Sequence, residues 1–168
     1  KEEIGSVGST GSEAIFFDNC IAEMINKVCD YNDLKLRRTL SNSYMLSSDV
    51  SAAYDPNYPQ VNELKNTAFL GYGIGLNQFT GSNDANAEFV AKIRKIFDKD
   101  NIKYQFSELG RVDQGGGGTI AYTFANRNIE VIDAGIPVQN MHAPYEVSSK
   151  VDIYEGYLAY KTFLKEMK

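Results

Sequence analysis

Segments with the pattern of a strand alternate along this chain with segments that have the pattern of a helix. Strands are expected at 43–48, 69–76, 104–106 and 129–132. One helix is expected to end near Cys29, and later helices to start near Asn83, Thr119 and Ser149. Because alternating strands and helices form βαβ units, the sequence predicts an α/β fold with a largely parallel sheet.

Several local patterns refine this expectation. The spacing of Thr10 and Glu13 is that of a capping box and predicts a helix start. The polar stretch 30–42 is expected to be a loop. Glycine occupies alternate positions in the expected strand 69–76, so one face of that strand admits a close approach. A helix packed on that face is favoured over a substrate groove.

Composition bounds the class of protein. A chain of 168 residues with 43% hydrophobic residues is expected to form one domain with a real core. With 17 basic and 22 acidic side chains the net charge is −5, and no basic stripe supports nucleic-acid binding. No apolar run reaches membrane-spanning length and no signal peptide is recognised, so no membrane partner is expected.

The cysteine content bears on the compartment. Cys20 and Cys29 lie nine positions apart, so on one helix they would point to opposite faces and could not pair. We therefore expect two reduced, buried thiols and a cytoplasmic protein.

The chain holds a single histidine, His142. Histidine is the commonest neutral metal ligand and the usual proton shuttle. With one histidine available, a motif that needs two is excluded within these residues. Any active site must therefore combine His142 with carboxylates.

Three such positions lie at apparent strand ends: the pair Glu2 and Glu3, then Asp49, then His142. Carboxylates with an imidazole suit Zn²⁺, Mn²⁺ or Co²⁺. Each residue also has a plainer interpretation, as a solvated surface pair, a turn cap or a structural loop residue. The glycine run 115–118 is either a flexible turn or a nest of N–H groups for an anion.

Five segments, in order, resemble the aminopeptidase I / aspartyl aminopeptidase family of zinc metallopeptidases across nearly the whole chain. They are EEIGSVGSTGS at 2–12, SSDVSAAYDPNYP at 47–59, GSNDANAEF at 81–89, ELGRVDQGGGGTIAY at 108–122 and VIDAGIPVQNMHAPYE at 131–146. The resemblance implies a three-layer α/β sandwich with a mixed, largely parallel sheet. It also implies a metal-dependent aminopeptidase acting on peptides.

Carried over by position, the resemblance makes Glu2 the general base and Glu3 a metal ligand. Asp49 corresponds to a ligand of a second metal, and His142 to the last ligand, sharing its metal with Glu3. The family carries two divalent metals, usually zinc, with cobalt or manganese as alternatives. Glu146, four residues after His142, is a candidate partner that orients the imidazole.

The resemblance also has gaps. The family's first histidine ligand and its bridging aspartate lie before the segments matched here, and its insert domain is missing. Residues 1–168 are therefore expected to be the C-terminal portion of the catalytic domain. Ala52 and Asp55 stand where many members have histidines implicated in substrate binding, and the position near Gly75 lacks a lysine that such members carry. An acidic substrate preference is therefore not implied.

Two alternatives to an aminopeptidase remain open at this point. One is an inactive fragment or scaffold of such an enzyme, and the other is a related dinuclear-metal hydrolase with another amide substrate. Family members form homo-oligomers, commonly dodecamers, so a homo-oligomer is expected.

Overall fold

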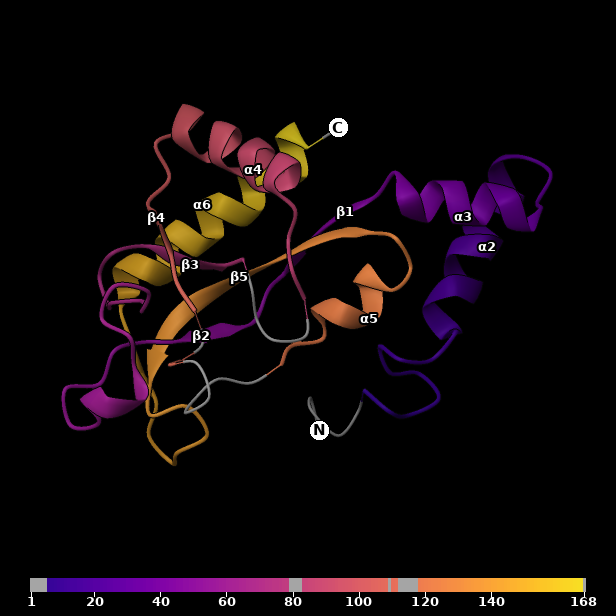
Figure 1. Cartoon of the computed structure of the whole chain (residues 1–168). Coiled ribbons are helices and arrows are strands. Elements are labelled where there is room, and N and C mark those ends of the chain that lie inside the picture. Colours follow the sequence, from indigo (N-terminus) through magenta and orange to yellow (C-terminus); the bar gives the residue numbers. More distant parts are fainter. Residues whose placement is uncertain (1–5, 79–82, 109, 112–117, 168) are drawn as a thin grey trace.

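A computed structural model describes residues 6–78, 83–108, 110–111 and 118–167 (Figure 1). Its helices are α2 (Phe16–Val28), α3 (Asp33–Ser41), α4 (Ala87–Lys99), α5 (Ala121–Ala125) and α6 (Lys150–Glu166), with a 3-10 turn η1 (Pro59–Val61). Its strands are β1 (Tyr44–Ser47), β2 (Val50–Ala52), β3 (Ile74–Asn77), β4 (Tyr104–Phe106), β5 (Glu130–Gln139) and β6 (Val147–Ser148).

Strand β5 is the centre of the sheet. The strand order is β1-β5-β3-β4, and β2 and β6 pair with the later part of β5. Both β1 and β2 run parallel to β5, and β3 runs parallel to β4. β5 is antiparallel to β3 and to β6, so the sheet is mixed. The expected α/β fold with a mixed, largely parallel sheet is confirmed.

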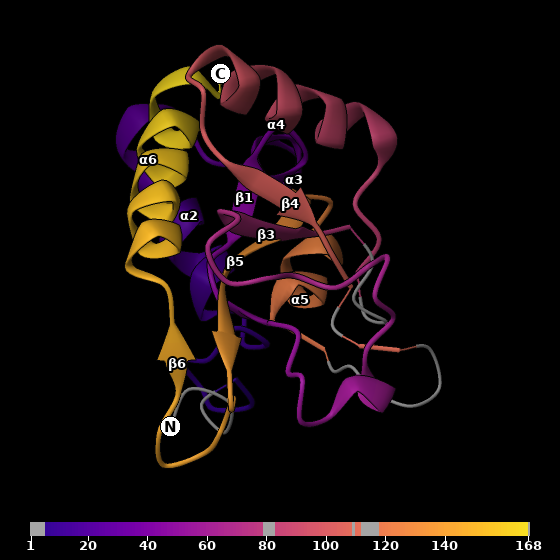
Figure 2. The same ribbon diagram turned by 90° about the vertical axis from the view of Figure 1, so that its left-hand side faces the viewer.

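Helices cover both faces of β5 because successive side chains of a strand point to opposite faces. Ile132 and Ala134 lie in a core formed with α4 and α6. Helix α4 contributes the buried side chains Phe89, Ile93 and Phe97 to this core. Val131, on the other face, packs in a smaller core with Leu40 of α3 and Ala121 of α5. Figure 2 shows α4 and α6 on one side of the strands, with α5 on the other. These layers make the expected three-layer sandwich.

The expectations for residues 10–42 were partly wrong. The first helix begins at Phe16, and its N-cap residue Ile15 receives no side-chain hydrogen bond, so the capping box at Thr10 and Glu13 does not form. The predicted loop contains α3. Asn32 caps this helix by accepting the N–H of Lys35, and the side chains of Leu36 and Leu40 give the helix an apolar inner face. The thiols of α2 and its C-cap are free and exposed, not buried.

The glycine-rich strand also differs from the expectation. Strand pairing starts only at Ile74, and Gly71 and Gly73 lie before it with φ of +87° and +94°. In the strand itself, a Cβ on Gly75 would come within 3.3 Å of the Ser51 and Ser107 side chains. At Gly75 the close approach is therefore made by two serines from neighbouring segments.

Helix α6 anchors this glycine turn. Asp152, in its first turn, is fully buried and accepts the N–H groups of Gly71 at 2.7 Å and Gly73 at 2.8 Å. One buried carboxylate thereby satisfies two backbone donors and fixes the entry into β3. Among the described helices, none combines the length and apolar character that a bilayer crossing requires.

Candidate metal centre

Asp49 lies just after β1, at the point where the chain passes from β1 to β2. Its side chain is half-buried, and Oδ1 accepts the N–H of Val50 at 2.7 Å. Its carbonyl accepts the N–H of Ile136 at 3.2 Å, which pins the backbone of Asp49 against β5. A Cβ on Gly135 would lie 2.5 Å from that carbonyl oxygen. Glycine at position 135 therefore lets β5 approach Asp49 closely.

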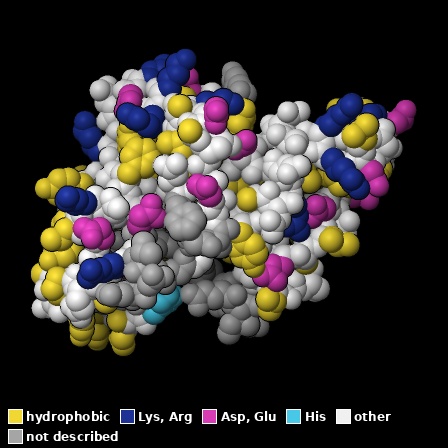
Figure 3. Space-filling model, in the orientation of Figure 1, with side chains coloured by type: hydrophobic (Ala, Val, Ile, Leu, Met, Phe, Trp, Pro, Cys, Tyr) yellow, Lys and Arg dark blue, Asp and Glu magenta, His cyan; other side chains and the backbone are white. Residues whose placement is uncertain are grey.

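His142 lies in the turn that follows β5, in a backbone conformation that few residues other than glycine adopt. Its φ is +67°, in the left-handed region where Asn, Asp and His are the commonest non-glycine residues. The preceding Asn140 has φ of +58° and its carbonyl accepts the N–H of Ala143 at 2.9 Å. This tight turn holds the residue at the surface, where Figure 3 shows the imidazole in cyan.

Glu146 contacts the same turn from its far end. Its Oε1 accepts the backbone N–H of His142 at 2.7 Å. The donor in this bond is the main-chain N–H of His142, so Glu146 fixes the backbone on which the imidazole stands. The predicted role of Glu146 as a partner that orients the imidazole stays a prediction.

Glu2 and Glu3, the predicted general base and metal ligand, lie outside the described residues. Within the described part of the chain, no group of three or more His, Cys, Asp and Glu side chains is placed to hold a metal ion. Asp49 follows β1 and His142 follows β5, and their roles as metal ligands stay predictions.

A polar cavity of about 290 Å³ lies beside Asp49. Its described wall is made by Asp49, by Ser6, Ser12 and Glu13 of the N-terminal segment, and by residues 118–123 around the start of α5. Tyr122 donates a hydrogen bond to the Glu13 carboxylate, and this bond raises the pKa of Tyr122. The N-terminal segment that follows Glu2 and Glu3 is thus tied to the cavity beside Asp49.

Tyr160 of α6 lies near enough to Asp49 to be affected by its charge. Burial raises the pKa of the Tyr160 phenol, a hydrogen bond with Ser48 lowers it, and the charge of Asp49 raises it further. Tyr160 donates to the carbonyl of Ala134 at 2.8 Å. Asp49 therefore lies within electrostatic range of a half-buried phenol that is hydrogen-bonded to β5.

Sequence reasoning missed several residues around this site. Ser51 is fully buried two positions after Asp49, and it accepts a hydrogen bond from Asn77 Nδ2 at 3.1 Å. Ser107 donates to Asn77 Oδ1 at 2.7 Å. Serine and asparagine are common on surfaces, so the residue types gave no sign that these side chains are buried.

The family model described as aminopeptidase I zinc metalloprotease (M18) matches residues 1–164. A relative from Clostridium acetobutylicum, named a probable M18 family aminopeptidase 1, is 54% identical over 170 residues, covering 98% of this chain and 37% of the relative. The chain thus spans little more than a third of the length of the curated relatives that it matches.

Solved structures of aminopeptidases show the same similarity. The crystal structure of the M18-family enzyme from Thermotoga maritima matches 98% of this chain and 38% of its own, with a TM-score of 0.92 and 42% identity. The crystal structure of aminopeptidase I from Clostridium acetobutylicum matches 98% of this chain and 36% of its own, with a TM-score of 0.86 and 53% identity. The arrangement around β5 is therefore one that known aminopeptidases share.

Proposed function

Because the chain belongs to the M18 family of aminopeptidase I zinc metalloproteases, we propose that it contributes the general base and three metal ligands of a zinc-dependent aminopeptidase site. The observation that carries this proposal is the placement of Asp49 and His142. Asp49 follows the carboxyl end of β1 and is bonded through its carbonyl to Ile136 of β5, and His142 lies three residues beyond the carboxyl end of β5. Such strand ends are where open α/β sheets bind ligands.

The residues present fit a divalent metal. Carboxylate oxygen and imidazole nitrogen are ligands that zinc accepts. The Asp49 carboxylate accepts the N–H of Val50, and Glu146 accepts the backbone N–H of His142, so the carboxylate and the backbone that carries the imidazole are both held by the protein. Together with Glu3, they would hold two zinc ions, Asp49 on one and Glu3 with His142 on the other. When bound, such ions supply Lewis acidity that activates water for attack on a peptide carbonyl.

The side chains of this chain supply the proton transfers and the positioning. Glu2 takes the proton of the attacking water and later delivers it to the nitrogen of the departing amine. Glu146 keeps the His142 turn in its left-handed conformation. Gly135 lets the carbonyl of Asp49 approach β5 closely, so the Asp49 carboxylate stays in register with that strand.

Zinc content tests the ligand assignment in the 168-residue chain. We expect His142→Ala and Asp49→Asn each to lower the bound zinc measured by mass spectrometry after gel filtration. Tyr145→Ala, at an 84% exposed neighbour of His142, is the matched control and should leave zinc unchanged. Equal zinc in all four proteins would contradict the assignment.

A backbone variant tests the placement of Asp49 without touching a ligand. Gly135→Ala puts a methyl group against the Asp49 carbonyl, and overpacking of this kind typically costs about 1–3 kcal/mol. We expect weaker zinc binding. Gly156→Ala is the control, because its methyl group meets only the tip of the Ile136 side chain.

Turnover tests the activity. In a protein that removes N-terminal residues from peptides, Glu2→Gln should abolish turnover and retain zinc. A panel of aminoacyl and acylated substrates separates an aminopeptidase from a related dinuclear hydrolase. Zinc binding without turnover on any of them would favour the alternative of an inactive fragment or scaffold.

We also propose a homo-oligomer. A solved structure of the Saccharomyces cerevisiae protein mApe1 is a dodecamer, and it matches 99% of this chain at 23% identity with a TM-score of 0.79. At that identity the likeness concerns the fold, so assembly of this protein needs its own measurement. Light scattering at several concentrations gives the mass directly, and a monomer at all of them would reject the proposal.

A further inference from the structure

Asp49 lies where one edge of the sheet is interrupted, between β1 and β2. Val50, the first residue of β2, pairs with Ile136, and β1 keeps the same sequence separation from β5 as β2 does. No residue is therefore inserted between the two strands, and Asp49 stands opposite Gly135. Because the strands stop on either side of Asp49, its position depends on its neighbours in β2 and on what those neighbours contact.

Two paired glycines lie beside this interruption. Gly135 of β5 pairs with Gly75 of β3, so neither strand carries a side chain at this level of the sheet. A Cβ on Gly135 would lie 2.9 Å from the backbone nitrogen of Ser51. A Cβ on Gly75 would lie 3.3 Å from the hydroxyl oxygen of Ser51. Glycine at both positions therefore lets the Ser51 side chain reach from β2 across β5 to β3.

The Ser51 hydroxyl joins a buried hydrogen-bond network on β3. Its Oγ lies 3.1 Å from Nδ2 and 3.3 Å from Oδ1 of Asn77. From the other side, the hydroxyl of Ser107 donates to Asn77 Oδ1 at 2.7 Å. All three residues are at most 3% exposed. This Ser51–Asn77–Ser107 network links β2, β3 and the residue that directly follows β4.

The network can pass a change at Ser107 to Asp49. An amide side chain has a donor end and an acceptor end, and the Ser107 hydroxyl holds the acceptor end of Asn77. The Nδ2 group of Asn77 is thereby directed at Ser51. Between Ser51 and Asp49 lies Val50, whose N–H donates to the Asp49 carboxylate at 2.7 Å. A constraint on Ser51 therefore reaches the Asp49 carboxylate through one intervening residue.

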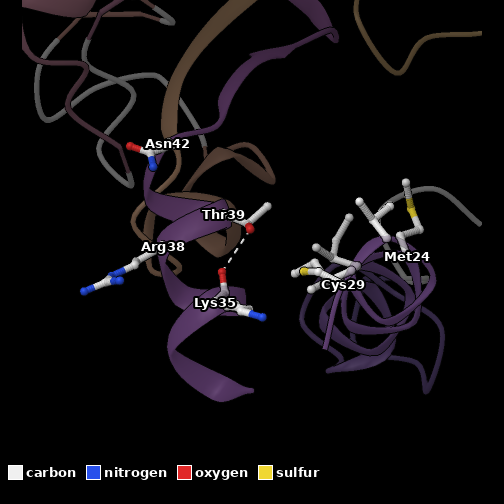
Figure 4. Close-up of a pocket in the computed structure, with 9 residues that line it drawn as sticks. Met24, Cys29, Lys35, Arg38, Thr39 and Asn42 are labelled. Carbon is white, nitrogen blue, oxygen red and sulfur yellow. Dashed lines mark hydrogen bonds between the residues drawn. The ribbon is translucent and has the colours of Figure 1, made fainter. Parts of the chain in front are cut away.

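Hydroxyl bonds elsewhere in the structure can be purely local. Figure 4 shows Thr39 of α3 donating to the carbonyl of Lys35, one turn earlier in the same helix and beside a cavity between α2 and α3. A buried polar network adds little net stability over apolar groups of the same shape, but its bonds fix the relative positions of its members. A network that joins three segments beside a candidate ligand therefore points to a role in geometry.

We propose that Ser51, Asn77 and Ser107 are positioning residues for Asp49. The network holds the first residues of β2 against Gly135 and thereby holds the Asp49 carboxylate where a metal ion would bind. This role rests on the proposed function, since it takes Asp49 to be a metal ligand. Residues that support metal ligands without touching the metal commonly set the affinity for it.

The amide proton of Ile136 tests the positioning without any metal, because it is donated to the Asp49 carbonyl. Ser107→Ala removes the hydroxyl at the far end of the network, in a different segment from Asp49 and Ile136. We expect the Ile136 amide to exchange roughly fivefold faster in this variant, as measured by NMR. Thr162→Val is the control, because Thr162 is similarly buried and donates a bond of the same 2.7 Å length, to Asp100. It should leave Ile136 unchanged.

A double variant separates positioning from a general loss of stability. Ser51→Ala alone should also speed the exchange of Ile136. If Ser107 acts on Asp49 through Ser51, adding Ser107→Ala to Ser51→Ala should cause little further change, whereas independent effects would multiply. Circular dichroism checks that each variant is folded. If Ser51→Ala is not folded, Ser51→Cys takes its place, since a thiol keeps the size of the side chain and weakens the bond.

Zinc affinity tests the connection to the metal. It is measured in the 168-residue chain by competition with a chelator. Ser107→Ala should weaken zinc binding by about tenfold, and Thr162→Val should leave it unchanged. Asp49→Asn is measured alongside, because it tests the ligand role itself.

Four results would overturn the proposal. Three concern the Ile136 amide: unchanged exchange in Ser107→Ala, an equal change in Thr162→Val, or effects that multiply in the double variant. The fourth is unchanged zinc affinity in Ser107→Ala where Asp49→Asn lowers it. If Asp49→Asn leaves zinc binding unchanged while Ile136 responds to Ser107→Ala, the proposed ligand role of Asp49 fails, and the hold of the network on the Asp49 backbone stands.

Discussion

Helices α4 and α2 have the same length and a similar apolar stripe, but they end up in opposite surroundings. Each has 13 residues. Helix α4 buries Phe89, Val90, Ile93 and Phe97, whereas α2 buries no residue. Figure 1 shows α4 over the strands, while α2 and α3 form an arm that stands away from the sheet. The apolar stripe sets which side of a helix is apolar, but the chain topology decides whether other residues pack against that side.

The largest expected effect separates the two helices by stability. Phe97→Ala in α4 removes a fully buried ring and should cost roughly 3–5 kcal/mol of unfolding free energy. Met24→Ala in α2 removes a side chain that is 64% exposed and should change it by less than about 0.5 kcal/mol. Urea unfolding followed by circular dichroism measures both. Comparable costs would mean that α2 is packed as tightly as α4.

A second effect, of comparable size, concerns the buried carboxylate of Asp152 in the body of the molecule, which is the sheet together with α4, α5 and α6. Asp152→Ala leaves the N–H groups of Gly71 and Gly73 without their acceptor, at roughly 1–3 kcal/mol for each unsatisfied donor. Asp33→Ala, in the first turn of α3 in the arm, is the matched control and should cost less than about 1 kcal/mol. If the two substitutions cost the same, the glycine turn does not depend on α6.

The body was predictable from the sequence to a large degree. Strands at 44–47 and 104–106 and the inward face of α4 follow from apolar periodicity, because these segments pack against a sheet that the same chain provides. The ten-residue length of β5 could not be predicted from the sequence, because Asp133 and Pro137 interrupt its apolar run. Both residues are nevertheless buried.

The arm and the site were less predictable. The sequence of helix α3 predicts a polar loop because charged side chains cover most of the helix surface and only Leu36 and Leu40 point inward. The sequence placed Asp49 and His142 after strands, as the structure has them. It could not show the left-handed backbone of His142, which a local turn sets, or the close approach of Gly135, which depends on a contact with the distant residue Asp49.

The junction between body and arm gives a third prediction. Arg127, after α5, donates to Asp18 of α2 at 2.7 Å and to the carbonyl of Ala14 at 2.9 Å. Arg127→Met keeps the apolar stem and removes both bonds, so it should release the arm. We expect faster amide exchange in residues 14–20 and a loss of about 1–2 kcal/mol in the unfolding free energy, between the values of exposed and buried ion pairs.

The matched control is Lys99→Met, which breaks an exposed ion pair between Lys99 and Glu166 within the body. It should leave exchange in residues 14–20 unchanged. Unchanged exchange in Arg127→Met as well would show that the arm is held by the packing of Phe17 on Phe124 alone.

The smallest expected effect is a pH dependence that distinguishes a tyrosine of the body from one of the arm. Burial is the main cause that raises the pKa of Tyr160 above its ordinary value, whereas a hydrogen bond to Asp33 is the main cause for Tyr31, which is largely solvated. A phenol with a raised pKa in the folded state holds its proton more tightly there than in the unfolded chain. Its contribution to stability is therefore complete below about pH 10 and is lost as the pH rises from there through the folded-state pKa.

Comparison with phenylalanine variants isolates this contribution. Tyr160→Phe should be destabilised by about 1 kcal/mol near pH 8, because the hydrogen bond to the Ala134 carbonyl is lost. That difference from the wild type should shrink above about pH 10, where the buried phenol of the wild type is penalised for ionising. Tyr31→Phe should differ little from the wild type at either pH, since water replaces its partner at the exposed site. Urea unfolding at pH 8, 9, 10 and 10.5 measures both series. A difference for Tyr160→Phe that stays constant to pH 10.5 would mean that the phenol beside Asp49 is as accessible to water as the one on the arm.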